Sequence, residues 1–155
     1  MSRAINLEAA VWITQLSKRT LWRRLAEGLI TRQEHDDEGR TMLAFEGLVP
    51  MLCIPMTQED HELVIEAAAG NAGAQTDVAL LFLDAEKPDV GLHWLTLAAD
   101  QGHSDAMHHL SKLYIQGSGL PKDDSLGLMW LAKAASLGHT IAGEQITALT
   151  RLGKA

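Results

Sequence analysis

The sequence of 155 residues has few cysteines, prolines and aromatic residues, and it has no long apolar run. Cys53 is the only cysteine, so the chain can form neither an internal disulfide nor a zinc site built from cysteines. The longest apolar stretches, such as residues 78–83, are far shorter than the roughly 20 residues that cross a bilayer. We therefore expect a soluble protein that does not enter a membrane.

The N-terminus also lacks the features of a secretion signal. Glu8 appears before an apolar segment of signal-peptide length develops. Together with the single cysteine, this favours the reducing cytoplasm as the location. With 46% hydrophobic and 21% charged residues, the composition is that of a globular protein and excludes a disordered tail or a collagen-like fibre.

The charge is distributed unevenly along the chain, although the net charge is −7. Residues 1–32 contain six basic and two acidic side chains, whereas residues 57–155 contain six basic and thirteen acidic ones. Pro50 and Pro55 separate these regions and prevent one helix from running through. We expect two domains, residues 1–55 and 56–155. Thr57 and Asp60 have the spacing of a capping box, which predicts a helix at the start of the second domain.

Residues 62 onward repeat themselves, which is the most informative property of the sequence. Gly70, Gly102 and Gly138 lie 32 and 36 residues apart, and an alanine follows each of them four residues later. Further matches at the same offsets are Phe82 with Tyr114, Trp94 with Trp130, and residues 98–99 with residues 134–135. The loop at residues 116–125 is four residues longer than the loop at residues 84–89, which accounts for the change of offset.

Each repeat is predicted to form two helices. The spacings of three and four place Ala106, Leu110, Leu113 and Tyr114 on one face of a first helix, and Leu128, Leu131, Ala132 and Ala135 on one face of a second. Small side chains let two helix axes approach closely, and glycine ends a helix in the left-handed conformation. A single pair cannot bury its apolar face, so neighbouring pairs must stack. A last helix over residues 140–151 would close the stack.

The unit at residues 106–139 resembles a Sel-one-like repeat, a relative of the tetratricopeptide repeat. The resemblance rests on residues 106–114, the Gly-x-Gly loop at residues 117–119, and residues 130–139. The unit before it is similar but has no Gly-x-Gly loop, and Gly91 and Gly127 stand where the family usually has alanine. The resemblance covers roughly residues 62–150. It implies a right-handed helical solenoid that binds other proteins, normally without catalysis.

In such a solenoid the first helix of each pair lines an inner groove. We therefore predict that polar residues of these helices contact a partner protein. The candidates are Gln75, His108, Lys112 and Gln116.

The basic N-terminal region is predicted to contain two helices and a hairpin. Asn6 can cap a helix over residues 7–13, and Ser17 can cap a second over residues 18–27, which Gly28 ends. The short connection between them indicates a helix-turn-helix. Residues 31–35 and 40–45 are predicted to form two short strands around a turn that contains glycine.

Residues 5–50 resemble the winged helix-turn-helix of the mercury-regulator (MerR) and phage excisionase families. The resemblance is carried by the Ser-x-x-Thr-Leu-aromatic-Arg segment at residues 17–23 and the Glu-Gly-Leu-Ile segment at residues 27–30. It implies DNA contacts from Ser17, Lys18, Arg19, Thr20, Arg23 and Arg24 on the second helix and from Arg32 and Arg40 on the wing. The chain departs from the pattern at Gln15, which replaces the usual turn glycine, in its acidic wing tip at residues 36–38, and in having no long dimerisation helix.

Metal binding and catalysis are not predicted. His103 and His139 occupy equivalent positions after a helix-ending glycine, where a capping role explains both. His108 and His109 are adjacent and point about 100° apart on a helix. Asp105 and His109 share a face four residues apart, but two ligands with no obvious third make a weak metal site. No nucleophile motif or phosphate-binding loop is present, and apolar residues flank Cys53. Packing explains Trp94 and Trp130, so we predict no cofactor and no enzymatic activity.

The sequence thus predicts a mainly α fold, in which a short α–α superhelix of Sel-one-like hairpins follows a small winged helix-turn-helix domain with a two-stranded wing. Two functions remain open. The first is a non-enzymatic adaptor or regulator, in a bacterial setting, that binds a partner protein through the repeat groove and uses the winged helix as a second surface. The alternative is a sequence-specific DNA-binding regulator that reads double-stranded DNA with the helix at residues 18–27, as a homodimer.

Overall fold

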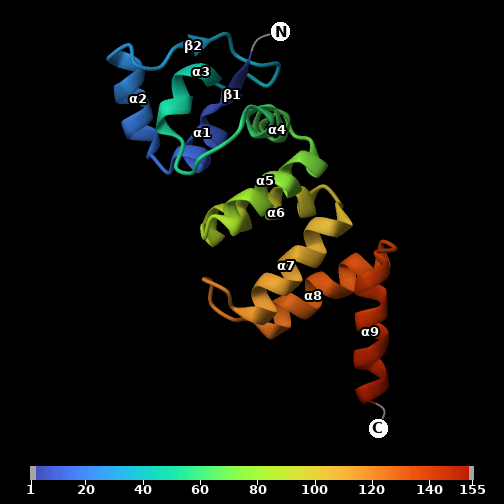
Figure 1. Ribbon diagram of the computed structural model, residues 1–155. Helices are drawn as coiled ribbons and strands as arrows, with labels where there is room; N and C mark the ends of the chain where they lie inside the picture. The colour runs from blue at the N-terminus through green and yellow to red at the C-terminus, as the bar shows by residue number, and fades with distance from the viewer. Residues whose placement is uncertain (1–2, 154–155) are drawn as a thin grey trace. The chain divides into compact units, whose positions relative to one another are not determined.

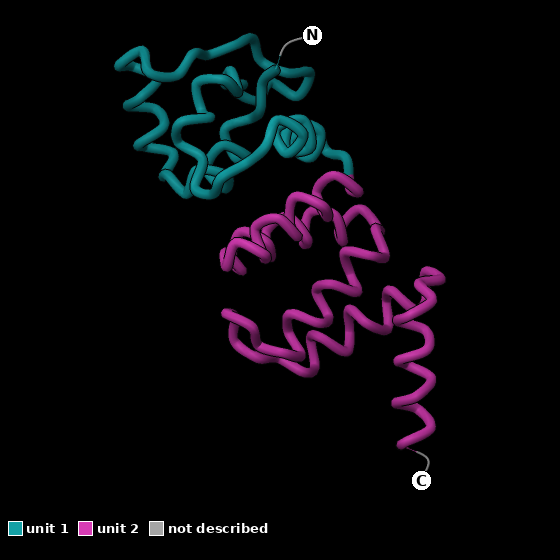
Figure 2. Tube along the Cα trace, in the orientation of Figure 1, with its two compact units in different colours: residues 1–71 teal, residues 72–155 magenta. Residues whose placement is uncertain are grey.

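The computed structural model describes residues 3–153 and is mainly helical (Figure 1). The chain divides into two compact units, which we call the N-terminal unit, residues 1–71, and the C-terminal unit, residues 72–155 (Figure 2). Within residues 3–153, no helix combines the length and the apolar character that a membrane crossing requires.

The N-terminal unit combines a small antiparallel sheet with short helices. Its elements are β1 (Ala4–Asn6), α1 (Leu7–Thr14), α2 (Lys18–Ala26), β2 (Arg32–Gln33), β3 (Met42–Ala44), α3 (Phe45–Leu48), the 3-10 helix η1 (Val49–Met51) and α4 (Gln58–Ala68). The strand order is β1-β3-β2, and Leu43 of β3 lies opposite both Ile5 and Arg32. The sequence predicted the hairpin of β2 and β3, but it gave no signal for β1, whose three residues are too few to show alternation.

Side-chain caps set the helix starts that the sequence predicted. The Asn6 side chain accepts a 2.8 Å hydrogen bond from the Ala9 amide, and the Ser17 hydroxyl accepts one of 3.1 Å from the Thr20 amide. Both bonds of the capping box between Thr57 and Asp60 are present. Gln15 follows α1 with φ 57°, so it adopts the left-handed turn conformation that glycine usually provides.

Helix α4 belongs to the N-terminal unit, so this unit extends past Pro55 to Asn71. The Asn6 amide donates a 3.2 Å bond to the Ala68 carbonyl, and the Phe45 and His61 rings meet edge to face with centroids 5.3 Å apart. These contacts join α4 to β1 and α3, which local sequence patterns cannot show. The division into domains at residue 55 stays a prediction.

The C-terminal unit consists of two helical hairpins and a last single helix. The first hairpin is α5 (Ala72–Asp84) with α6 (Pro88–Asp100), the second is α7 (Ser104–Gln116) with α8 (Asp124–Ser136), and α9 (Thr140–Gly153) follows. Helix α6 also packs on α7, and α8 packs on α9 (Figure 1). This order is the helical-repeat arrangement that the sequence predicted.

One glycine in each hairpin lets its two helices pack closely against each other. A Cβ atom added at Gly91 of α6 would lie 2.6 Å from the Leu83 side chain, and one at Gly127 of α8 would lie 2.5 Å from Ile115. The two glycines are 36 residues apart and the two apolar residues are 32 residues apart, so both pairs occupy equivalent positions in the repeats. Glycine therefore replaces the usual alanine because a large side chain of the paired helix occupies the space.

The same contact corrects the predicted packing face of α8. Its buried residues are Gly127, Leu131 and Ala134, whereas Leu128 is 43% exposed. Three-and-four spacing alone allows both faces, and the spacing of Leu128, Leu131 and Ala135 predicted the other one. Helix α7 instead packs against the face with the glycine, because Ile115 fits there.

Two histidines dock the last helix α9. His139 Nδ1 accepts a 3.1 Å bond from the Ala142 amide, so His139 caps α9 as predicted. His139 Nε2 lies 3.0 Å from Asp105 Oδ1. The ring of His108 stacks on His139 with centroids 4.6 Å apart, and its Nε2 lies 3.0 Å from Gln145 Oε1.

The capping role predicted for His103 is wrong. Its side chain makes no cap bond to α7. Its Nδ1 lies 3.0 Å from the Thr76 hydroxyl of α5 instead, so His103 joins two helices rather than ending one.

The packing role of Gly127 predicts opposite effects for two substitutions of glycine by alanine. Gly127→Ala gains about 1 kcal/mol of helix propensity. The added Cβ atom, however, overpacks the contact with Ile115 and lies 3.1 Å from the Ser111 carbonyl oxygen, which costs about 1–3 kcal/mol of stability. Gly143→Ala in α9 meets no atom within 4 Å and should stabilise the protein by up to about 1 kcal/mol. Thermal unfolding of the two variants measures the difference. Equal stabilisation by both would contradict the packing account.

The docking of α9 predicts that the protein loses stability as the pH falls. Burial lowers the pKa of His108, and the nearby His139 and Lys112 lower it further, against the opposing effects of Gln145 and Asp105. The unfolded chain therefore takes up the proton first, from about pH 6.5 downward, and the stability that neutral His108 contributes is lost as the pH falls through its lower folded value.

Denaturant unfolding at pH 7.5 and pH 5.5 checks this expectation. His108→Gln should reduce the loss of unfolding free energy between the two pH values. His35→Gln, in an exposed loop of the N-terminal unit, serves as the control and should keep the full loss. An unchanged loss in the His108 variant would refute the assignment.

Candidate functional site

The first candidate surface is a row of polar side chains along α7. His108, Lys112 and Gln116 follow one another at intervals of four residues, so they share one face of the helix. Lys112 and Gln116 are exposed, whereas His108 is only 8% exposed. The His108 ring contacts Gln145 and stacks on His139, so it holds α9 in place. Lys112 and Gln116 are therefore the accessible part of the row.

Gln75 is also part of the helix packing. It lies in α5, is 4% exposed, and its Oε1 accepts a 2.8 Å bond from the Gln101 amide. The four predicted contact residues therefore divide into two that bind other side chains of the C-terminal unit and two that face outward. Contact of any of them with a partner protein stays a prediction.

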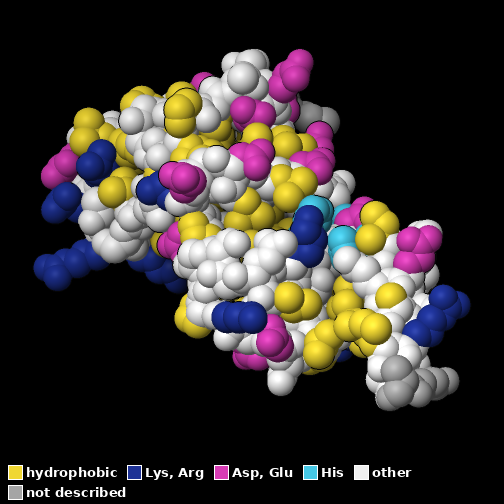
Figure 3. All heavy atoms as spheres, turned by 60° about the horizontal axis from the view of Figure 1, so that its bottom comes forward, with side chains coloured by type: hydrophobic (Ala, Val, Ile, Leu, Met, Phe, Trp, Pro, Cys, Tyr) yellow, Lys and Arg dark blue, Asp and Glu magenta, His cyan; other side chains and the backbone are white. Residues whose placement is uncertain are grey.

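The second candidate surface is the basic face of α2 and the wing. Figure 3 shows Lys and Arg side chains gathered at the α2 end of the N-terminal unit. Three of the six cations of α2 and the wing have a carboxylate partner within residues 3–153. The pairs are Lys18 with Glu8 at 3.2 Å, Arg23 with Glu27 at 3.9 Å, and Arg40 with Asp36 at 2.6 Å and Glu38 at 3.4 Å.

The two hydroxyl groups predicted to contact DNA are engaged as well. Ser17 donates a 3.0 Å bond to the Thr20 hydroxyl while its own oxygen caps α2. A phosphate at Ser17 would compete with Thr20 for the hydroxyl proton, and a phosphate at Lys18, Arg23 or Arg40 would compete with the carboxylates. Arg19 and Arg24 differ, because neither forms an ion pair with any residue in the described range 3–153.

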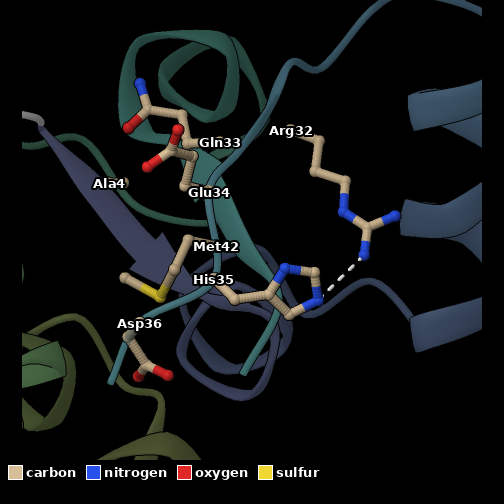
Figure 4. A pocket seen from close by; sticks show the side chains of 7 residues that line it. All are labelled: Ala4, Arg32, Gln33, Glu34, His35, Asp36 and Met42. Atoms are coloured by element: carbon tan, nitrogen blue, oxygen red, sulfur yellow. Dashed lines mark hydrogen bonds between the residues drawn. The ribbon is translucent and has the colours of Figure 1, made fainter. Parts of the chain in front are cut away.

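Arg32 lies between an aromatic ring and a histidine. Its guanidinium carbon is 5.8 Å from the ring centroid of Trp22, which is 41% exposed, and its Nη2 is 3.1 Å from His35 Nε2. Figure 4 shows this bond at the edge of an open pocket of about 640 Å³. The pocket is lined by Ala4, Arg32, Gln33, Glu34, His35, Asp36 and Met42. Its charged groups carry both signs, so it has no net preference for an anion.

A further pocket lies between the loops of the two hairpins in the C-terminal unit. We call it the loop pocket. It has a volume of about 450 Å³ and is lined by Leu83, Glu86, Pro88, Leu113, Ser118 and Gly119. The Gly-x-Gly loop is recognisable in the sequence as a repeat feature, but no binding role was predicted for it. The signal was available, because a loop four residues longer than its counterpart reaches further.

No cluster of metal ligands appears in the part of the chain that the structure describes. Within residues 3–153, no three side chains of histidine, cysteine, aspartate or glutamate come together as metal ligands. Burial lowers the pKa of His109, with a contribution from Lys112, so a neutral ring is favoured there. Cys53 is half-buried in the N-terminal unit and forms no disulfide within residues 3–153.

Comparison with known proteins identifies the repeats. The family model described as Sel1 repeat matches residues 74–103 and 104–139. No curated protein matches the chain. A Sel1 repeat protein from Oxalobacter formigenes has a similar crystal structure, with 34% sequence identity over 56% of this chain and a TM-score of 0.50.

A second crystal structure, of a protective antigen of uropathogenic Escherichia coli with an SLR fold, matches 93% of this chain with 22% identity and a TM-score of 0.56. The matches cover 26% and 32% of the two known chains, so this chain spans about a quarter to a third of their length. These matches do not show a winged helix-turn-helix, which stays a prediction. Proteins of this repeat class generally mediate protein–protein interaction. The Sel1 repeat model matches two successive stretches in the C-terminal part of the present chain, which has the helical-repeat SLR fold.

Proposed function

We propose that this protein is a non-enzymatic adaptor that binds a partner protein through the helical repeats of its C-terminal unit. The observation that supports the proposal is the pair of Sel1 repeats at residues 74–139, since repeats of this class generally act as interaction scaffolds. Lys112 and Gln116 extend from α7 into solvent without being needed for packing, so they are the residues that a partner can reach.

The N-terminal unit supplies a second attachment surface in this proposal. Arg32, Trp22 and Arg19 expose cationic and aromatic groups, which are enriched where proteins bind one another. The carboxylates beside Lys18, Arg23 and Arg40 reduce the local positive potential, which favours a protein partner over a polyphosphate. We place this adaptor in the cytoplasm.

The alternative function is DNA binding by the N-terminal unit. It is favoured by one observation, the order α1, α2, β2 and β3 with two unpaired cations, Arg19 and Arg24, on α2. These two residues would carry the phosphate contacts, because they need not leave a carboxylate first.

The adaptor proposal predicts that changes on α7 weaken capture of a partner. Replacing Lys112 and Gln116 together by alanine should lower the amount of partner retained from nuclease-treated cytosol about fivefold, as expected for contacts worth about 1 kcal/mol. Both side chains are exposed, so circular dichroism should show an unchanged helix content.

Lys133→Ala is the matched control for this experiment. Lys133 lies on α8, and its ammonium group is 4.9 Å from the Trp130 ring centroid, so the variant loses the same charge on a second helix. It should leave capture unchanged. If the control and the double variant retain equal amounts of partner, α7 does not line the interaction groove.

The two functions differ in their response to salt. On the adaptor proposal, replacing Arg19 and Arg24 by alanine leaves the weak retention of duplex DNA unchanged. On the DNA alternative, the substitutions weaken binding and make the log–log salt slope shallower by about 0.9 for each lost phosphate contact. Filter binding over a salt series measures both. The control, with Lys133 and Arg151 replaced by alanine, removes two cations from the C-terminal unit.

A further inference from the structure

The loop pocket is a built feature of the C-terminal unit rather than a gap between flexible loops. Gly119 has φ 76°, and a Cβ atom added there would lie 2.5 Å from Pro88 Cγ. The loop after α7 therefore folds directly onto the start of α6. Only glycine allows both this conformation and this approach, so the loops of the two hairpins are held in contact.

The base of the loop pocket is apolar. Leu83 comes from the last turn of α5 and Leu113 from the last turn of α7, and Pro88 forms a side wall. Leu113 is only 8% exposed, so it belongs to the core and presents a small apolar surface to the pocket. At about 450 Å³, the pocket has room for an aliphatic side chain together with part of the next residue.

The rim of the loop pocket is acidic. Glu86 is exposed and forms no ion pair with any residue between positions 3 and 153. Asp84, the last residue of α5, is also exposed, and Glu86 lies two residues beyond this helix end, where the helix dipole favours a cation. Of the nearby cations, Lys122 already lies 3.8 Å from Asp124, and Lys87 is half-buried.

We propose that the loop pocket binds a partner segment in which an aliphatic side chain is followed by lysine or arginine. The aliphatic group fills the space between Leu83, Leu113 and Pro88, and the cation pairs with the Glu86 carboxylate. This inference rests on the proposed adaptor function and extends it, because it names the chemistry of the segment recognised at a place away from the exposed row on α7.

Short peptides test the proposal directly on the full chain. The probes are acetyl-leucyl-arginine amide, acetyl-leucyl-glutamate amide and acetyl-alanyl-arginine amide, titrated into 15N-labelled protein at millimolar concentration. The leucyl-arginine probe should shift the backbone amides of Glu86, Ser118 and Gly119. It should bind about two- to fivefold more tightly than the leucyl-glutamate probe, which is the range for an exposed ion pair.

Two variants identify the groups responsible. Glu86→Gln keeps the size of the side chain and should remove the preference for arginine over glutamate, while the leucyl probes still bind. Glu144→Gln, in α9 outside the pocket, is the matched control and should change nothing. The alanyl-arginine probe should bind more weakly than the leucyl-arginine probe, because it leaves the apolar base unfilled.

The results separate this proposal from the adaptor function. Equal binding of the arginine and glutamate probes, or shifts that lie outside the pocket, overturns the loop-pocket proposal. Partner capture that depends on Lys112 but not on Glu86 also overturns it while the adaptor function stands. Peptide binding at the pocket without any captured partner supports the pocket and counts against the adaptor function.

Discussion

The structure of the C-terminal unit depends on close contact between the two helices of each hairpin. Gly91 and Gly127 leave space for Leu83 and Ile115, so that the helix axes can approach and the apolar faces are removed from water. A hairpin buries only one face in this way, and the next helix must cover the other. The stacking of α6 on α7 and of α8 on α9 follows from this need, and it brings the loops of successive hairpins together at the loop pocket.

Charge has different consequences in the two units. In the N-terminal unit, acidic residues lie next to half of the cations of α2 and the wing, so this region presents less unpaired positive charge than its sequence suggests. In the C-terminal unit, Glu86 keeps its charge available at the edge of an apolar pocket. The proposed partner contacts use this difference. The repeats offer apolar space with an acidic rim, and the N-terminal unit offers aromatic and guanidinium groups around Trp22.

The histidines show where reasoning from the sequence succeeds and where it fails. His103 and His139 follow equivalent glycines, and the sequence predicted a capping role for both. Only His139 caps its helix, because Asp105 holds the far side of its ring, while Thr76 draws His103 toward α5. His108 stacks on His139 and docks α9, a role that the sequence did not indicate, while its contact with a partner stays a prediction. In each case the residue that decides the role lies on another helix, at a distance along the chain that local patterns do not reveal.

The sequence by itself determined the repeat register, the helix starts and the long Gly-x-Gly loop. These features depend on interactions within a few residues, such as the caps of Asn6, Ser17 and Thr57, or on a periodicity that recurs along the chain. Only the tertiary structure decided which face of α8 is buried, that α4 and β1 join the N-terminal unit, and which cations stay unpaired. The physical reason is that each of these outcomes depends on a contact between segments distant in sequence, where the shape of one side chain selects among faces that local spacing leaves equivalent.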